Sequence, residues 1–350
     1  MGRTTAIKVH FPLQDGRGSC IDLAAALHVG GISGAIANAG PEEHKYDQLN
    51  REATDWFTPV DWDEAEVAVY PYEAVAGEEV DRVAAEARRR GIGCIFLSWG
   101  DADRPVAVSY GTVYRHSMFA DTRLPNEEAM PAEVSDPWIE LGQPIAPRDK
   151  RDQPTVGFCG FVSNPLFRAA YRATGRKRKA DALAFRARVL RAVNANPAVQ
   201  CRFILRQSYW AGTRSRFHYN AQAQFTPRMT FWKNVTESDY TVCVRGAGNF
   251  SYRFYEVLAA GRIPLFINTK CVLPFDDQID WRQHCVWVEE DQLSRAGEIL
   301  MDFHSRMSDS QFRQLQLSNR ALWESKLSPL GFFRSALARA CAKDVQAPLK

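Results

Sequence analysis

Strand-like and helix-like hydrophobic patterns alternate over the first part of the chain. The apolar runs at 6–11, 66–70 and 92–98 have the length and composition of buried strands. Between the last two runs, apolar residues recur at the spacing of one helix face, and they are Val80, Val83, Ala84 and Ala87. This spacing predicts a helix over 77–90 that Gly91 closes in a left-handed conformation. The alternation predicts an α/β fold.

A second α/β unit follows a proline-rich passage at 124–154. Prolines interrupt any regular element there, so we expect a domain boundary near its end. Beyond it the patterns predict a strand at 155–159, a helix at 180–193, strands at 201–205 and 240–244, a helix at 251–260 and a strand at 263–267. A last helix-like stretch covers 311–343.

These patterns divide the chain into three parts. We expect an N-terminal, acceptor-side domain over 1–150 and a C-terminal domain over 151–325. A terminal helix over 326–350 would pack on either lobe. A length of 350 residues exceeds the usual size of one hydrophobic core and favours two lobes.

Composition narrows the class of protein. With 45% hydrophobic and 24% charged residues the chain is an ordinary globular protein, and a net charge of +3 argues against a dedicated nucleic-acid binder. The eight cysteines lack the clustering of a metal site, which favours buried thiols in a reducing compartment. The sequence shows no signal peptide, membrane-spanning run or lipidation pattern. We therefore expect a cytoplasmic location.

The segment with the most chemical information is YTVCVRGAGNFSYRFYEVLAAGRIPLFI, which runs from a strand through a glycine-rich turn into a helix. Gly246 and Gly248 permit backbone angles and close approaches that other residues block. Asn249 or Ser251 is placed to cap the helix, whose free N–H groups and positive dipole end would face the carboxyl edge of the sheet. This arrangement predicts an anion site.

Charged side chains flank that turn. Arg245 precedes it and Arg253 lies in the first helical turn, where forked guanidinium donors suit phosphate oxygens. Glu256 lies on the same helix face and is placed to accept both hydroxyls of a ribose. Spacing alone leaves an ordinary turn, with Arg253 and Glu256 as a surface pair, as an equal alternative.

The run R-G-A-G-N-F-S-Y-R-F-Y-E-V-L-A-A-G-R-I-P closely resembles the signature of the exostosin family, family 47 of the glycosyltransferases. Weaker similarity extends to LPFDDQIDW at 273–281, TVGFCGFVSN at 155–164, EVAVYPY at 66–72 and DADRPV at 101–106. Only the C-terminal half matches strongly. The resemblance implies the GT-B fold, in which two Rossmann-like domains face each other across a cleft. It also implies an inverting transfer from a nucleotide sugar that requires no metal or other cofactor.

The resemblance further implies which residues hold the donor. They are Arg245, Ser251, Arg253 and Glu256, with Gly246, Gly248 and Asn249 shaping the loop. Arg206 follows a strand, in RQSYWAG, and is a further candidate for the donor cleft together with the stacking aromatics Tyr209 and Trp210. Packing between helices explains these three residues equally well.

An inverting transfer needs a base that takes the proton of the acceptor hydroxyl. Arg245, Arg253 and the helix start would stabilise the charge that grows on the β-phosphate. Asp101 and Asp103 follow a buried run and are candidate bases at the carboxyl edge of the N-terminal sheet, but aspartates in such turns are more often structural. His116 is an alternative base, although a histidine within an apolar strand is more often a core residue.

The most basic stretch of the chain covers 172–191 and includes RATGRKRK. A basic stretch of this kind usually forms a solvated face. The functional alternative is contact with anionic acceptor chains, or peripheral contact with the inner face of a membrane.

The leading hypothesis is an exostosin-like hexosyl- or pentosyltransferase of polysaccharide biosynthesis. It would move a sugar from a nucleoside-diphosphate donor, with UDP as the expected nucleotide, to a glycan or lipid-linked acceptor. A non-catalytic nucleotide-sugar or glycan-binding protein of the same fold is the alternative. A nicotinamide-dependent oxidoreductase fits poorly, because Asn268, Thr269 and Lys270 stand where an acidic residue is expected.

Overall fold

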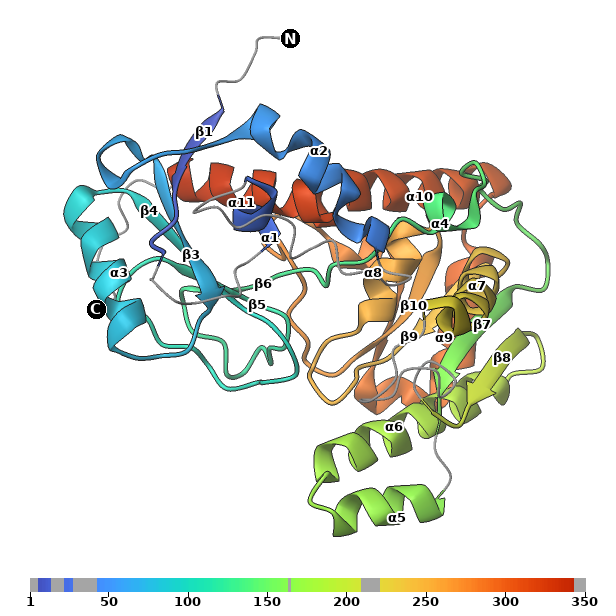
Figure 1. Ribbon diagram of the computed structural model, residues 1–350. Helices are drawn as coiled ribbons and strands as arrows, with labels where there is room; N and C mark the ends of the chain where they lie inside the picture. The colour runs from blue at the N-terminus through green and yellow to red at the C-terminus, as the bar shows by residue number, and fades with distance from the viewer. Residues whose placement is uncertain (1–5, 14–21, 28–42, 163–164, 209–220, 343–350) are drawn as a thin grey trace.

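The protein consists of two α/β lobes that lie side by side (Figure 1). The computed structural model describes residues 6–13, 22–27, 43–162, 165–208 and 221–342. Tyr209 and Trp210, the candidate stacking aromatics, lie outside the described residues. Each lobe is built on its own parallel sheet, so the predicted α/β fold class is confirmed.

The sheet of the N-terminal lobe has six strands, and neighbouring strands run parallel. They are β1 (Ile7–His10), β2 (Phe57–Pro59), β3 (Val67–Glu73), β4 (Gly93–Ser98), β5 (Thr112–Arg115) and β6 (Glu127–Ala129). Their order is β2-β1-β3-β4-β5-β6. The two central strands β3 and β4 are buried along most of their length, which is why their sequences are continuous apolar runs.

Helix α3 (Glu78–Arg90) connects β3 to β4 and confirms the predicted helix. Its buried residues are Val80, Val83, Ala84 and Ala87. Gly91 follows with a φ of 68°, the left-handed conformation expected of a helix-closing glycine. The other helical segments of this half are α1 (Asp22–Ala26), η3 (Glu43–Tyr46), α2 (Asp47–Trp56), η4 (Trp62–Glu64) and α4 (Pro137–Leu141).

The C-terminal lobe contains a five-stranded parallel sheet in the order β11-β10-β9-β7-β8. Its strands are β7 (Thr155–Phe161), β8 (Gln200–Arg206), β9 (Tyr240–Cys243), β10 (Ile263–Asn268) and β11 (Val286–Glu289). This is the flavodoxin-like variant of the doubly wound fold, in which the strand order reverses between the first and third strands. Ligands of such sheets bind beyond the carboxyl ends of the strands at that reversal. Here the reversal lies between β7 and β9.

Helices pack around this second sheet (Figure 1). They are α5 (Pro165–Ala173), α6 (Lys177–Asn194), α7 (Ala221–Thr236), α8 (Tyr252–Ala259) and α9 (Ala296–Ser305), with the short 3-10 segments η6 (Trp281–Gln283) and η7 (Glu290–Arg295). Helix α8 follows the glycine-rich turn as predicted. Helix α6 begins three residues before the predicted start, because the basic residues that precede its apolar face are helical too.

The helix-like stretch predicted at 311–343 is divided in two. Helix α10 (Asp309–Leu322) continues into a π-helical turn, η8 (Trp323–Leu327), before α11 (Pro329–Ala342) begins. Ser328 between them is extended, as expected of a residue that precedes proline. Helix α11 returns to the N-terminal lobe, where Phe332 packs edge-on against Tyr114 of β5 at a ring-centroid distance of 5.2 Å.

One hydrophobic core extends through both lobes, and each lobe also has a core of its own. A single cluster of buried apolar side chains includes Val9 and Ile95 of the N-terminal sheet, Phe266 and Trp281 of the C-terminal lobe, and Leu337 of α11. The lobes are therefore held together by burial of apolar surface as well as by polar contacts.

Candidate functional site

A cavity of about 560 Å³ lies at the reversal point of the C-terminal sheet. Its walls come from the carboxyl end of β7, from the turn after β9 and from the first turns of α8. The N-terminal lobe contributes Lys45 and Asp101. Two lobes built on parallel sheets thus face each other across a cavity, which is the predicted GT-B arrangement.

The two glycines of the turn after β9 serve different purposes. A Cβ on Gly248 would lie 2.9 Å from both the Asp101 Cα and the Ser117 Oγ, so the N-terminal lobe leaves room only for glycine. A Cβ on Gly246 would meet nothing within 4 Å, and Gly246 lines the cavity. Neither residue has a positive φ. Of the two possibilities that the sequence offered, backbone angle and close approach, close approach is the reason for Gly248.

The prediction that Asn249 or Ser251 caps α8 is confirmed for the position of Ser251 but not for a capping hydrogen bond. Ser251 occupies the N-cap position, but its side chain accepts no hydrogen bond from the helix. It lines the cavity instead. Asn249 is fully buried, and its Nδ2 donates to the carbonyl oxygens of Met118 and Thr269, both at 3.1 Å. Asn249 thus fastens the turn to the N-terminal lobe and leaves the start of α8 facing the cavity.

Arg253, in the first turn of α8, lines the cavity. Its Nη2 donates to the carbonyl oxygen of Cys159 at 2.8 Å, and its Cζ lies 4.4 Å from the ring centroid of Phe158. A Cβ on Gly160 would lie 2.7 Å from this Nη2, so the glycine makes room for the guanidinium group. The Arg253 Nε is buried and has no hydrogen-bond partner among the described residues. Such an orphaned donor beside a cavity suits an anionic ligand.

Glu256 lies one turn further along α8 and also lines the cavity. Nη1 of Arg228, a residue of α7, donates to its Oε1 at 3.2 Å. The same guanidinium group donates two hydrogen bonds to Glu140, at 3.0 and 3.1 Å, and the Trp232 indole donates a third at 2.6 Å. This buried network fixes the position of the Glu256 carboxylate at the cavity wall.

Positive charge predominates on the cavity wall. The lining cations are Lys45, Lys179, Arg186, Arg206, Arg228 and Arg253, and the lining carboxylates are Asp101 and Glu256. Burial raises the pKa of the Cys159 thiol, so this lining residue stays neutral at pH 7. An excess of positive charge in an enclosed site favours a ligand with more than one negative charge.

Main-chain carbonyl groups orient two of these cations. Arg206, at the end of β8, donates from Nη2 to the carbonyl oxygen of Pro227 at 2.6 Å. Arg186 of α6 donates from Nη1 to the carbonyl oxygen of Phe161 at 2.8 Å, and it is only 7% exposed. A neutral carbonyl orients a guanidinium group without neutralising its charge. Both guanidinium groups are therefore held at the cavity wall.

Arg245 is not among the residues that line the cavity. Its Cζ lies 5.8 Å from the ring centroid of Phe185 on α6. Its Nε is buried without a hydrogen-bond partner among the described residues. A role of Arg245 in donor binding stays a prediction.

The structure separates the two candidate aspartates. Asp101 lines the cavity, and its Oδ1 accepts a hydrogen bond from the Gly248 N–H at 3.2 Å. Asp103 is not among the lining residues and pairs instead with Arg178 of α6, with 2.6 Å between Oδ2 and Nη2. Arg178 belongs to the basic stretch interpreted as a solvated face, and here it joins the two lobes.

His116, the alternative base, is a buried residue at the junction of the lobes. It is 2% exposed, and its ring stacks on Phe250 at a centroid distance of 5.2 Å. Its Nδ1 lies 3.3 Å from the Gly100 N–H and accepts from it. Burial lowers the pKa of His116 to about 4, so the ring is neutral at pH 7. Its position agrees with the core histidine that the apolar strand favoured.

Comparison with protein families shows what most of the C-terminal lobe is similar to. Residues 164–303 match the model of the exostosin GT47 domain, and this span includes the turn after β9 and all of α8. Over this span the chain is similar to an exostosin GT47 domain. Strand β7 and the N-terminal cavity residues Lys45 and Asp101 lie outside the matched span.

Curated relatives of the chain are named as exostosins and glucuronosyltransferases. Exostosin-1 of Drosophila melanogaster is 33% identical over 90 residues, which cover 26% of this chain and 11% of that protein. Exostosin-2 of Homo sapiens is 31% identical over 108 residues, 31% of this chain and 14% of that protein. A probable glucuronosyltransferase of Oryza sativa subsp. japonica is 27% identical over 124 residues, 35% of this chain and 29% of that protein. The match thus covers less than a third of each relative.

Solved structures resemble the chain over a longer span but loosely. WaaG, a glycosyltransferase involved in lipopolysaccharide biosynthesis, aligns with a TM-score of 0.33 at 9% identity, over 86% of this chain and 82% of that chain. The GtfA/B complex bound to UDP and GlcNAc aligns with a TM-score of 0.27 at 7% identity, over 85% of this chain and 60% of that chain. Likeness at this level does not extend to individual site residues.

Four lining cations were not among the residues predicted from the sequence. They are Lys45, Lys179, Arg186 and Arg228. For Arg186, which lies within the matched span, the interpretation as part of a solvated face is wrong. Its position carried a usable signal, because it lies four residues after Ala182 and three before Val189, on the buried face of α6. Nothing in the local sequence distinguishes Arg228 or Lys45.

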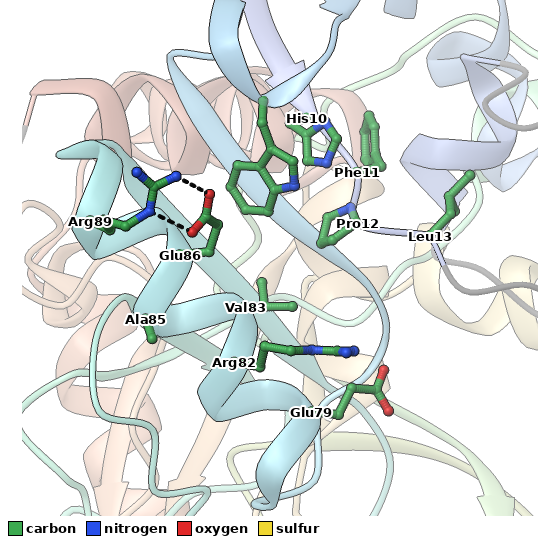
Figure 2. A pocket seen from close by; sticks show the side chains of 11 residues that line it. His10, Phe11, Pro12, Leu13, Glu79, Arg82, Val83, Ala85, Glu86 and Arg89 are labelled. Carbon is green, nitrogen blue, oxygen red and sulfur yellow. Dashed lines mark hydrogen bonds and ion pairs between the residues drawn. The ribbon is translucent and has the colours of Figure 1, made fainter.

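A second cavity lies outside the matched span, between α3 and the residues that follow β1 (Figure 2). Two arginines, Arg82 and Arg89, and two carboxylates, Glu79 and Glu86, line it, so their charges balance. Glu86 accepts two hydrogen bonds from Arg89, at 2.6 and 2.8 Å, as Figure 2 shows, and Glu79 accepts one from the Tyr70 hydroxyl. The cavity beside α8 has an excess of cations instead, and we therefore take it as the candidate active site.

Proposed function

We propose that this protein is a glycosyltransferase that moves a sugar from a nucleoside-diphosphate donor, with UDP as the nucleotide, to a glycan or lipid-linked acceptor on the cytoplasmic side of a membrane. The observation that carries the proposal is the excess of guanidinium groups at the strand-order reversal, beside a span that is similar to an exostosin GT47 domain. Relatives named as exostosins and glucuronosyltransferases support the same reaction class.

In this proposal the diphosphate binds against the first turn of α8. Arg253, Arg186 and Arg206 would donate to its oxygens, and the positive end of the helix dipole adds to their attraction. Negative charge grows on the β-phosphate as the bond to the anomeric carbon breaks, and prearranged donors stabilise that charge. The guanidinium groups would then stabilise the charge of the leaving diphosphate, a role that a metal ion can also fill. Glu256 would accept the ribose hydroxyls.

Asp101 is the base that we propose for the acceptor. The acceptor oxygen attacks the anomeric carbon from the side opposite the diphosphate, so the configuration inverts. Asp101 takes the hydroxyl proton, and the nucleoside diphosphate leaves with the electron pair of the broken bond. Because the Asp101 Oδ1 accepts from Gly248, the turn that precedes α8 also orients the base.

Two substitutions test the proposal. Asp101→Asn keeps an oxygen that accepts from Gly248 but cannot take a proton, so transfer should fall by roughly 100-fold or more at unchanged UDP affinity. Arg253→Lys removes the fork that donates to Cys159, and it should lower kcat/KM by about 100-fold, or roughly 3 kcal/mol. Release of UDP from a panel of UDP-sugars measures both effects. Wild-type turnover in both variants would refute the assignment.

A non-catalytic nucleotide-sugar-binding protein is the second candidate. The hydrogen bond from Gly248 to Asp101 favours it, because that bond alone gives the aspartate a structural purpose. This candidate predicts UDP binding that Arg253→Lys weakens, together with neither transfer nor donor hydrolysis by the wild-type protein. The same panel of UDP-sugars therefore separates the two.

A further inference from the structure

We propose that helix α5 and the turn after it dock on the surface of an anionic lipid bilayer. Helices α5 and α6 project from the C-terminal lobe at the bottom of Figure 1, and α5 is the outer of the two. It packs against α6, yet none of its residues is buried. This inference does not depend on the proposed reaction.

The exposed face of α5 is apolar. Leu166 is 82% exposed, the largest value for any large hydrophobic side chain among the described residues. Ala170 and Ala173 follow it at helical spacing and are exposed as well. The other side of α5 faces the lobe, where Phe167 contacts Phe161 edge-on at a ring-centroid distance of 6.2 Å. The helix is thus held by one side and presents an apolar stripe on the other.

Cations accompany this stripe. Residues 165–180 contain no acidic residue and six cations, Arg168, Arg172, Arg176, Lys177, Arg178 and Lys179. Arg172 pairs with Asp181 at 2.7 Å, and Arg178 pairs with Asp103 at 2.6 Å. Arg176, in the turn between α5 and α6, and Lys177, the first residue of α6, are both exposed.

The basic surface is smaller than the stretch 172–191 that the sequence indicated. Arg186 lies in the cavity, and Arg188 pairs with Glu290 at 3.3 Å. Once Arg186 and Arg188 are set aside, the cations beside the apolar stripe are those at the start of that stretch. They lie in α5, in the following turn and in the first turn of α6. Within that stretch, exposed basic and apolar side chains therefore coincide at α5 and the residues that follow it.

An anionic bilayer matches both features together. Apolar side chains of an interfacial helix enter the boundary of the acyl chains, while flanking cations contact lipid phosphates. A soluble polyanion would engage the cations and leave Leu166 in water. Among the described residues, no helix has both the length and the apolarity to cross a bilayer. The contact that we propose is peripheral.

Docking in this way would bring the candidate active site near the lipid surface. Phe161 lines the cavity and contacts Phe167 of α5, so the apolar stripe and the cavity are close neighbours. If the proposed glycosyl transfer holds, this placement favours a lipid-linked acceptor over a soluble glycan.

Vesicle sedimentation with the full chain tests the proposal. The wild-type protein should bind vesicles of phosphatidylcholine mixed with phosphatidylglycerol, and it should leave vesicles of pure phosphatidylcholine in solution. Leu166→Ser should weaken binding about tenfold, since it removes the most exposed apolar group. Lys177→Gln should weaken binding about fivefold at low salt, the typical effect of one cation near a charged bilayer. Leu317→Ser on α10 is the matched control, because Leu317 is also exposed, at 44%, and should not affect binding.

Several outcomes would overturn this inference. They are the absence of wild-type binding to the anionic vesicles, equal binding to the neutral ones, and equal binding by Leu166→Ser. Self-association in solution that Leu166→Ser abolishes, without vesicle binding, would assign α5 to a contact between copies of the chain. UDP affinity, measured separately without lipid, tests the proposed function. Failure of the membrane inference and failure of the proposed function can therefore be told apart.

Discussion

The direction in which single side chains point determines the charge of the cavity. Arg186 and Arg188 lie two residues apart on α6 and face different surroundings. Arg186 is buried at the cavity wall, whereas Arg188 is exposed and pairs with Glu290. Residue type does not separate these arginines, but the helical period does, because a step of two residues turns a side chain to another side of the helix.

These two arginines form a matched pair for testing the diphosphate site. We expect Arg186→Ala to weaken UDP binding by about tenfold to a hundredfold, the usual loss for one charge-assisted hydrogen bond. Arg188→Ala should leave the affinity within about twofold, because its side chain lies outside the cavity. Calorimetric titration with UDP measures both, and thermal melts verify that the variants are folded. Equal losses in the two variants would rule out the proposed contact of Arg186 with the donor.

A buried imidazole should make stability depend on pH. Burial lowers the pKa of His116 to about 4, against an ordinary value of 6.5 in the unfolded chain. Between these values the unfolded chain binds a proton that the native state does not, so the stabilisation is complete above pH 6.5 and declines as the pH falls towards 4. By about pH 4.5 the loss from this residue alone is on the order of 2–3 kcal/mol.

His116→Asn should remove this contribution. An asparagine oxygen can still accept from the Gly100 N–H but does not titrate. Urea unfolding at about pH 7.5 and about pH 4.5 gives the free energy of unfolding that each protein loses in acid. The variant should lose less than the wild type, by an amount on the order of 2–3 kcal/mol. The other histidines are common to both proteins and cancel in the comparison. Identical losses would mean that the native imidazole takes up the proton.

Elements with a short-range pattern could be predicted from the sequence. Helix α3 follows from its apolar spacing and Gly91, and α8 follows from the strand, turn and helix order around it. The break before α11 had the local signal of a serine followed by a proline, which the longer helical pattern obscured. The role of Asn249 could not be predicted, because its partner Met118 is 131 residues away.

Gly248, in the turn before α8, offers a test of the contact between this turn and the N-terminal lobe. In Gly248→Ala the new Cβ would lie 2.9 Å from the main chain at Asp101, so one lobe must shift, and we expect a loss of about 1–3 kcal/mol. Gly246→Ala places its Cβ in open space and should change stability by less than about 1 kcal/mol. Urea unfolding of both variants gives the comparison. Equal free energies of unfolding for the two variants would mean that the N-terminal lobe does not contact Gly248 closely in solution.

At the scale of the whole molecule, the lobes form one unit because α11 belongs to both. Arg339 of α11 pairs with Glu128 of the N-terminal lobe at 3.1 Å and with Asp277 of the C-terminal lobe at 2.9 Å. The apolar core also runs through both sheets. A contact between residues so far apart in the chain leaves no local pattern, which is why the packing of the terminal helix stayed open at the sequence level.

This shared core predicts cooperative unfolding. We expect one transition in urea, with the same midpoint by tryptophan fluorescence and by circular dichroism. UDP at about 100 times its Kd should stabilise that transition by about 2.7 kcal/mol, and hydrogen exchange should slow in β3 of the N-terminal sheet as it does in β9. The reason is that a ligand bound beside α8 stabilises every element that unfolds together with α8. Two transitions, with UDP shifting only one, would show that Arg339 and the common core do not couple the lobes.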